Sequence, residues 1–309
     1  METSKAEITT KYAIGKILGT GTFGTVRAAL SMTDFSKWAV KILRRKSLEG
    51  KQNEVVNTEA QILQIIRNPN IIFSKEVFYT KKHVLVFMER LNGGDLFDRI
   101  VKMERIPEVD ARLIFKQIVL AVRYLHSINV VHRDLKPENM MFETASMNST
   151  LKIIDFGLAT IMEPGKLMNS PCGSPGYVAP EILMDYPYNE KVYVWSIGVI
   201  LYVMLCGYPP FEHESKRVLF GMMIRGEYDF DSDEWLGISD EAKEIVRKML
   251  DVDYTTRISA SDILFHDWML PVMVAKGNRP SIPANVRRLI ETQKSVSLPK
   301  LLPPESVSS

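Results

Sequence analysis

The segment HRDLKPEN, residues 132–139, is the most informative stretch of this sequence for predicting the fold and the site. It groups charged side chains, a proline and an amide between two apolar runs, INVV before it and MMF after it. A buried or half-buried charge costs free energy unless it is paired or holds a charged ligand. The segment therefore indicates a loop that binds a charged ligand, in a place where a plain hydrophobic strand would otherwise fit.

A second acidic motif, IIDFG at residues 153–157, follows after a short gap. Mg²⁺ prefers oxygen ligands, commonly one or two side chains together with phosphate oxygens, which makes Asn139 and Asp155 candidate ligands. Asp134 can accept the proton of an acceptor hydroxyl, and Lys136 can offset charge on a transferred phosphoryl group. We interpret the two motifs as a site for Mg²⁺ and ATP phosphates; two ordinary polar turns are the alternative.

A glycine-rich stretch, GTGTFGTV, occupies residues 19–26. Its G-x-G-x-x-G pattern lets backbone N–H groups approach phosphates closely. A dinucleotide-binding fold would need a helix next and an acidic residue about 20 positions on, whereas here a strand follows and Lys41 stands at that position. The stretch is therefore predicted to cover phosphates as a β-hairpin, with Lys41 paired to Glu59. An outward-facing Lys41 on an edge strand is the alternative.

Hydrophobic periodicity predicts strands early in the chain and helices late. Pro107 fits the first turn of a long helix, and Leu113 is expected on the apolar face of that helix. The arrangement predicts a small sheet-rich lobe beside a larger helical one. Strands are expected at 12–18, 25–30, 37–43, 71–79 and 84–89, and helices at 53–67, 108–126, 190–205, 241–250 and 259–265.

Composition narrows the class of protein. The 309 residues carry a formal net charge of +2 with both signs interspersed, which argues against a nucleic-acid partner. The apolar run at 194–208 is too short to span a bilayer and is expected to be a buried helix, so no membrane partner is predicted. Two cysteines, Cys172 and Cys206, make no disulfide framework, and no signal peptide is visible. A cytoplasmic or nuclear location is expected.

Together these motifs resemble the eukaryotic protein kinase family. The ordered set GTGTFGTV, AVK, the helix glutamate, HRDLKPEN, DFG, GSPGYVAPE and VWSIGVI extends over about residues 12–268. The resemblance implies an α+β, bilobal protein kinase fold with a small β-rich N-lobe (12–88), a hinge (89–91) and a larger helical C-lobe (92–268). Residues 269–309 are expected to form a mobile or regulatory tail.

The resemblance also implies a role for each site residue, with Met88 as gatekeeper and ATP and Mg²⁺ as cofactors. It implies that His132, Phe156 and Leu63 stack between the lobes, and that Glu181 pairs with Arg257. The implied catalytic residues are Lys41, Glu59, Asp134 and Lys136, the metal ligands are Asn139 and Asp155, and the ATP-binding residues are Leu18, Gly19, Gly21, Gly24, Val26, Ala39, Lys41, Met88, Glu89 and Leu91.

Lys136 and the segment GSPGYVAPE are similar to the serine/threonine branch, in particular to the calcium/calmodulin-dependent and checkpoint kinases. The resemblance implies that Ser174 bonds near Asp134 and that Asp95 and Glu138 bind an arginine three residues before the phosphoacceptor. Val203 stands where relatives carry an acid for a second arginine. The expected activity is transfer of the ATP γ-phosphate to Ser or Thr in R-x-x-S/T segments of protein substrates.

Arg133 resembles the arginine of kinases activated by a phosphate on the activation segment. Ser170 is the candidate phosphosite, modified by an upstream kinase or by autophosphorylation; a simple loop turn is the alternative. The segment at 285–302 could be a degraded autoinhibitory or calmodulin-binding helix. Its sparse basic residues and Pro299 make calmodulin the less favoured partner.

One position departs from the family pattern. Tyr193 stands where relatives carry an aspartate that accepts hydrogen bonds from the backbone of the HRD loop. A phenol cannot supply two carboxylate oxygens, so a looser catalytic loop and weakened transfer are expected. The alternative function is therefore a pseudokinase or scaffold that binds nucleotide and transfers poorly.

Overall fold

The computed structural model describes residues 2–21, 24–45, 51–163, 165–170 and 172–270. Residues 22–23 of the glycine-rich stretch and the expected tail from residue 271 onward lie outside the described residues. So does the segment at 285–302, the candidate autoinhibitory or calmodulin-binding helix.

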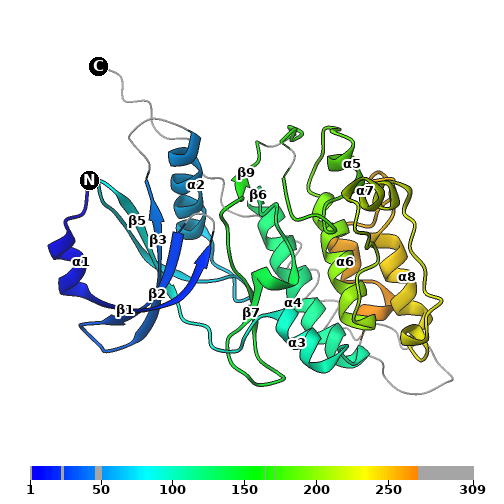
Figure 1. The fold of residues 1–309 in the computed structure, drawn as a ribbon, viewed down its shortest axis with the longest axis horizontal. Helices are drawn as coiled ribbons and strands as arrows, with labels where there is room; N and C mark the ends of the chain where they lie inside the picture. The colour runs from blue at the N-terminus through cyan, green and yellow to red at the C-terminus, as the bar shows by residue number, and fades with distance from the viewer. Residues whose placement is uncertain (1, 22–23, 46–50, 164, 171, 271–309) are drawn as a thin grey trace, which may run out of the picture. The chain divides into compact units, whose positions relative to one another are not determined.

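A five-stranded antiparallel sheet forms the N-terminal region (Figure 1). Its strand order is β1-β2-β3-β5-β4, so β5 lies between β3 and β4. Gly24 at the start of β2 is required sterically, because a Cβ there would come within 2.2 Å of the Ile42 carbonyl oxygen. The strands are β1 (Tyr12–Gly21), β2 (Gly24–Ser31), β3 (Lys37–Arg44), β4 (Ser74–Tyr79) and β5 (His83–Glu89).

Two helices accompany the sheet. Helix α2 (Lys51–Ile65) contacts β4 and β5 and ends two residues before the predicted boundary. Helix α1 (Lys5–Lys11) was not predicted; Ser4 caps it by accepting a hydrogen bond from the Glu7 N–H, and buried Ile8 belongs to the same apolar cluster as Phe87 of β5. A seven-residue helix carries too short a pattern to be recognised, and tertiary packing stabilises it.

The C-terminal region is mostly helical, which confirms the predicted order of elements. Leu113 was predicted on the buried face of α4, but its side chain is 55% exposed, because neighbouring Ile114 and Phe115 point to the core. The helices are α3 (Leu96–Met103), α4 (Glu108–Ser127), α5 (Pro180–Leu183), α6 (Val192–Cys206), α7 (Lys216–Arg225), α8 (Asp240–Met249) and α9 (Ala260–Ile263), with 3₁₀ turns η1 (Pro137–Asn139), η2 (Asp233–Trp235) and η3 (Asp267–Met269).

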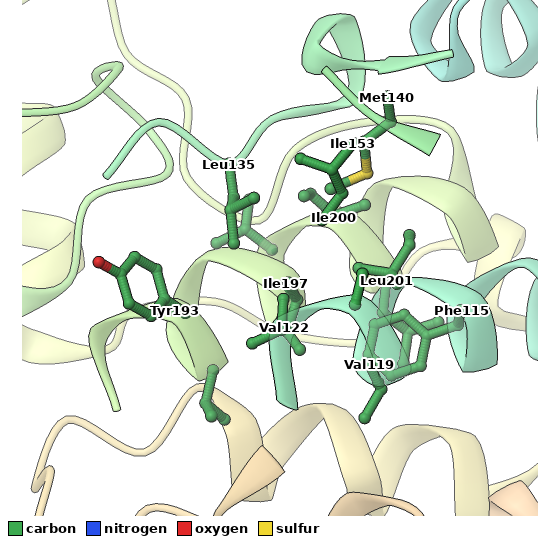
Figure 2. Packing of buried hydrophobic residues seen from close by; sticks show 14 of the residues in the cluster. Phe115, Val119, Val122, Leu135, Met140, Ile153, Tyr193, Ile197, Ile200 and Leu201 are labelled. Atoms are coloured by element: carbon green, nitrogen blue, oxygen red, sulfur yellow. The ribbon is translucent and has the colours of Figure 1, made fainter. Parts of the chain in front are cut away.

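Helix α6 is the centre of the C-terminal core. Its residues are buried on every side, with the exception of half-buried Ser196, and Gly207 ends it in the left-handed conformation. Ile197 and Leu201 pack against Val122 and Phe115 of α4 (Figure 2). This confirms the expectation of a core helix. Within the described part of the chain, no helix combines the length and apolarity needed to cross a membrane.

Two short two-stranded sheets present the motif loops. Strand β6 (Val130–Val131) pairs with β9 (Thr160–Ile161), and β7 (Met140–Phe142) pairs with β8 (Leu151–Ile153). The charged segment at 132–139 therefore runs between two buried strands. Burying charged side chains between apolar runs costs free energy. In this loop, paired strands fix both ends of the charged segment.

A buried ion pair joins α5 to the end of the domain, as the resemblance implied. Arg257 Nη1 and Nη2 donate to Glu181 Oε1 and Oε2 at 2.7 and 2.9 Å, and the two side chains are 0% and 2% exposed. Arg257 also donates to the carbonyls of Asp251 and Lys191. Bidentate geometry and further acceptors satisfy a guanidinium that has left water.

We predict that Arg257→Met lowers the free energy of unfolding by about 3–5 kcal/mol, because it leaves the Glu181 carboxylate buried and unpaired. Chemical denaturation followed by circular dichroism measures the change. Lys248→Met is the matched control, since Lys248 and Glu244 form an exposed pair at 2.8 Å, worth at most about 1 kcal/mol. Equal losses in the two variants would contradict the prediction.

Candidate active site

One cavity of about 570 Å³ is lined by the site residues that the motifs predict. It is lined by the sheet, by α2, and by the loops around β7 and β8. Every residue proposed as catalytic, ATP-binding or metal-binding lies on its wall: Leu18, Gly19, Gly21, Gly24, Val26, Ala39, Lys41, Glu59, Met88, Glu89, Leu91, Asp134, Lys136, Asn139 and Asp155. Segments more than 130 positions apart in the chain therefore meet around one space.

Some lining residues were not identified from the sequence. Met141 lies on β7 and Ile154 directly follows β8, and both are close to motif residues in the sequence. Ile72 precedes β4. Leu158 follows the DFG motif. Their apolar side chains supply the slot that a flat base needs. The only signal available was adjacency to a motif, because an apolar residue in a strand usually belongs to the core.

The register of the sheet positions the first part of the cavity. Ala39 of β3 pairs with Met88 of β5, and Lys41 pairs with Val26 on one side and Val86 on the other. Lys41 therefore lies on the interior strand β3, not on an edge, which excludes the alternative considered for it. Alternation along β3 brings Ala39 and Lys41 to the same face.

Lys41 is held between two carboxylates. Its Nζ lies 2.6 Å from Glu59 Oε1 and 2.7 Å from Asp155 Oδ1. Burial disfavours the charged ammonium, but the two carboxylates outweigh it and raise the pKa of Lys41. Burial likewise opposes ionisation of Asp155, and Lys41 outweighs it, so the pKa of Asp155 is lowered. Both groups are therefore charged at neutral pH.

The Asp134 carboxylate is fixed by three donors. The Ser174 hydroxyl donates to Oδ1 at 2.7 Å, and the Asn139 amide donates to Oδ2 at 3.0 Å. Lys136 Nζ lies 3.3 Å from Oδ2 and donates to Ser174 Oγ at 2.8 Å. Charge-assisted hydrogen bonds of this kind orient a carboxylate closely. The geometry is that of a general base positioned beside a cation.

Asn139 and Asp155 fit the needs of a hard cation. The Asn139 amide nitrogen donates to Asp134, which leaves its amide oxygen as the atom able to face a metal. The Ile154 N–H donates to the Asn139 carbonyl at 2.9 Å, so the two candidate ligands are tied through adjacent backbone. Oxygen donors from two side chains match the usual protein share of a Mg²⁺ site completed by phosphates.

His132 and Phe156 pack edge to face, with ring centroids 4.8 Å apart. Both are buried, and they belong with Leu63 of α2 to the buried interior. Burial lowers the pKa of His132, so its imidazole is neutral. The contact of His132 with Phe156 that the resemblance implied is present, and it joins the two motif loops.

The candidate substrate residues Asp95 and Glu138 lie outside the cavity. Asp95 is the N-cap of α3, where its Oδ1 accepts a hydrogen bond from the Asp98 N–H at 2.7 Å, and it bridges to Met141 of β7. Glu138 is exposed on η1. The structure therefore shows a capping role for Asp95 and leaves the arginine-binding role of both residues as a proposal.

The activation segment around Ser170 is held by Tyr188. The Tyr188 hydroxyl donates to the Ser170 carbonyl at 2.8 Å, and Met168 and Tyr188 form an antiparallel bridge. The Ser170 side chain is exposed. Arg133 Nε donates to the Leu158 carbonyl at 2.7 Å, and its charge opposes the burial-driven rise of the pKa of Tyr188. Arg133 and Ser170 are thus both associated with Tyr188.

Tyr193 fills a buried position beside the catalytic loop. Figure 2 shows its ring next to Leu135 and Ile197, with the hydroxyl directed away from the apolar cluster. Its Oη makes no hydrogen bond of normal geometry to any described residue, and burial raises its pKa well above the usual range. Nearby Arg133 has φ of 66°, a left-handed conformation that is unfavourable for a non-glycine residue.

His126 of α4, like Tyr193, has a buried polar atom without a hydrogen bond to the described residues. Its ring lies 5.3 Å from the Tyr193 ring, and its buried Nε2 has no partner among the residues that the structure describes. Burial lowers the pKa of His126 to about 4, with Glu190 opposing the shift. A carboxylate at position 193 would offer acceptors both to this imidazole and to the loop backbone.

Comparisons with known proteins agree with this site. The chain matches the protein kinase domain family over residues 12–269. It is 43% identical over 260 residues to calcium/calmodulin-dependent protein kinase type 1 of Macrobrachium nipponense, a match covering 84% of this chain and 75% of that protein. It is 41% identical over 263 residues to the type 1B enzyme of Rattus norvegicus (85% and 76%) and 38% identical over 263 residues to myosin light chain kinase A of Dictyostelium discoideum (85% and 89%).

The chain therefore belongs to the protein kinase family, and its sheet and helical region are those of the protein kinase fold. Within the family it is a serine/threonine protein kinase similar to the calcium/calmodulin-dependent type 1 enzymes, and it uses ATP. The family resemblance seen in the motifs is confirmed.

We predict that Tyr193→Asp raises kcat by about tenfold, equivalent to about 1.4 kcal/mol. The new carboxylate would accept hydrogen bonds from the strained loop that carries Asp134 and lower the cost of its active geometry. Steady-state phosphorylation of a peptide measures the change. Tyr193→Phe, which removes the hydroxyl and adds no acceptor, is expected to match the unsubstituted protein. An unchanged or lower rate in Tyr193→Asp would count against this explanation.

Proposed function

We propose that this kinase transfers the γ-phosphate of Mg-ATP to Ser or Thr in protein segments that carry an arginine three residues before the acceptor. The observation that supports it most is the convergence of Lys41, Asp134, Asn139 and Asp155 on one cavity. Its lobes are proposed as 12–88 and 92–268, joined by a hinge at 89–91.

Each catalytic side chain has a distinct part in the proposed transfer. Asp134 accepts the proton of the attacking hydroxyl, because its carboxylate is already oriented by Ser174 and Asn139. Lys136 offsets charge on the transferred group, and Lys41 binds the phosphates nearer the adenosine. Asn139 and Asp155 would hold Mg²⁺, which supplies neutralisation of phosphate charge when bound.

The proposed substrate preference rests on two acids and one missing acid. Glu138 is exposed one residue before Asn139, and Asp95 lies at the start of α3, which contacts η1. An arginine side chain can span both carboxylates through its fork of donors. Val203, which is buried in α6, supplies no carboxylate. A second arginine, two residues before the phosphoacceptor, is therefore not expected to be required.

Incubation with Mg-ATP and an oriented peptide library tests the function. We predict labelling of R-x-x-S/T peptides and a loss of about 100-fold or more in Asp134→Asn, which keeps the hydrogen-bonding shape but removes the base. Glu138→Gln should raise the KM for the arginine peptide and leave the KM for ATP unchanged. Chelation of divalent ions should abolish transfer.

The outcomes separate the rival functions. Nucleotide binding without labelling, in the unsubstituted protein and in Tyr193→Asp, would favour the scaffold instead. Labelling of peptides lacking the arginine with equal efficiency would overturn the substrate preference alone. Repeating the assay with calcium and calmodulin tests the less favoured partner, which relatives carry in their names: stimulation of transfer would assign calmodulin to the tail.

We further propose that a phosphate on Ser170, added by an upstream kinase or by the enzyme itself, activates transfer. The exposed Ser170 hydroxyl lies on a segment held by Tyr188, and a phosphate there would add charge that the Arg133 guanidinium can pair. Such a pair would fix the activation segment against the loop that carries Asp134.

We predict that phosphorylated protein transfers at least about tenfold faster than the dephosphorylated form, and that Ser170→Ala removes this difference. Mass spectrometry of protein incubated with Mg-ATP, before and after phosphatase treatment, locates the site. Ser146→Ala, an exposed serine between β7 and β8, is the matched control. A phosphatase-sensitive activity retained in Ser170→Ala would contradict the assignment.

A further inference from the structure

Lys152 is a buried lysine in the middle of β8 that has no role in the proposed transfer. It is 8% exposed. Its Nζ lies 2.9 Å from Glu89 Oε1 and donates to the Pro69 carbonyl at 3.1 Å. A buried ammonium is tolerated when acceptors replace its water. Here the acceptors come from two separate segments, the end of β5 and the loop between α2 and β4.

Glu89 is the first residue of the hinge, and its carboxylate is fixed from two directions. Besides Lys152, the Phe73 N–H donates to Glu89 Oε1 at 2.7 Å. The Glu89 N–H in turn donates to the Phe73 carbonyl at 3.0 Å. Both the backbone and the side chain of Glu89 are therefore bound, and Lys152 is the cationic partner of its carboxylate.

The same loop is tied to β8 by its backbone. The Ile72 N–H donates to the Ile153 carbonyl, and the Ile153 N–H donates to the Asn70 carbonyl, both at 2.9 Å. The Asn70 amide donates to the Leu151 carbonyl at 3.1 Å and to Gln117 of α4 at 2.9 Å. Strand β8 is thus a fixed reference to which both the loop and the hinge are attached.

Strand β8 also leads to the metal end of the cavity. Asp155, the candidate Mg²⁺ ligand, follows Lys152 by three residues, and Ile154 between them lines the cavity. One short segment therefore contacts the hinge through Lys152 and reaches the phosphate end through Asp155. The separation of these two ends must match the length of the nucleotide.

We propose that Lys152 is a positioning residue for ATP, which holds the hinge at the distance from Asp155 that the nucleotide requires. It touches neither substrate in this assignment and acts through Glu89. The proposal rests on the proposed adenine site at the hinge. Removal of the Lys152 charge is expected to weaken binding of the adenine half of ATP, while Asp134 and the peptide-binding residues keep their geometry.

The central variant is Lys152→Met, which keeps the length and apolar stem of the side chain and removes the charge. We expect the KM for ATP to rise about tenfold, as for the loss of one charge-assisted hydrogen bond, with kcat and the KM for peptide changed by less than about twofold. The affinity for adenosine, measured by calorimetry, should fall by the same factor as that for ATP, because adenosine lacks the phosphates that Asp155 and the metal would contact.

Three further variants keep the test decisive. Glu89→Gln should raise the KM for ATP by a smaller factor, and combining it with Lys152→Met should give less than the product of the two effects, because both break one pair. Lys152→Arg keeps the charge and should restore most of the affinity. Lys248→Met, in an exposed pair on α8, should change nothing. If Lys152→Met does not fold, Glu89→Gln decides the outcome.

The proposal would be overturned by an unchanged adenosine affinity in folded Lys152→Met and Glu89→Gln. It would also fail if the KM for peptide rose as much as the KM for ATP, since that pattern indicates a general loss of structure. An unsubstituted protein that binds neither ATP nor adenosine would instead overturn the proposed nucleotide site, so the two failures are distinguishable.

Discussion

The rest of the site depends on one largely buried cation, Lys41, held between Glu59 and Asp155. The three side chains come from β3, from α2 and from the loop after β8, so each contact fixes one segment against another. Burial alone would favour a neutral lysine, and the two carboxylates reverse that preference. Lys41 is the shared partner, because its removal would leave the buried Glu59 carboxylate without its ion pair, whereas removal of one carboxylate leaves the other paired with Lys41.

The loop that carries Asp134 also has a partly buried charge that needs partners, and more donors surround it. Asp134 is surrounded by Ser174, Lys136 and Asn139, so its charge is satisfied before any substrate arrives. The weaker element lies behind the loop, where the Tyr193 ring is packed but its hydroxyl makes no hydrogen bond of normal geometry to any residue that the structure describes (Figure 2). Hydrophobic burial of the ring stabilises the fold, whereas the strained backbone of Arg133 lacks a carboxylate acceptor there. Stability and catalytic order are thus opposed at this position.

Most of the sheet and the longest helices could be predicted from the sequence, because period-2 and period-3.6 patterns report directly on burial. The expectation failed where pattern length or neighbours decide: α1 is too short, Gly221 weakens the helical pattern of α7, and Leu113 lies beside the buried stripe of α4. The candidate site could be assembled from motifs because charged residues in apolar surroundings are rare. The apolar walls and the pair of Lys152 with Glu89 could not, since nothing local indicates which strand meets the hinge.

That last failure follows from how the chain is organised. Motif residues stand out by their chemistry, but the residues that set distances between motifs act through contacts made only after folding. Lys152 stands between the apolar residues Leu151 and Ile153. This alternation in isolation predicts a solvent-facing lysine on a half-buried strand. Tertiary structure reverses this expectation by covering β8 with the loop that contains Pro69 and with the hinge. A buried ion pair between a strand and a hinge is therefore a property of the fold that no local pattern encodes.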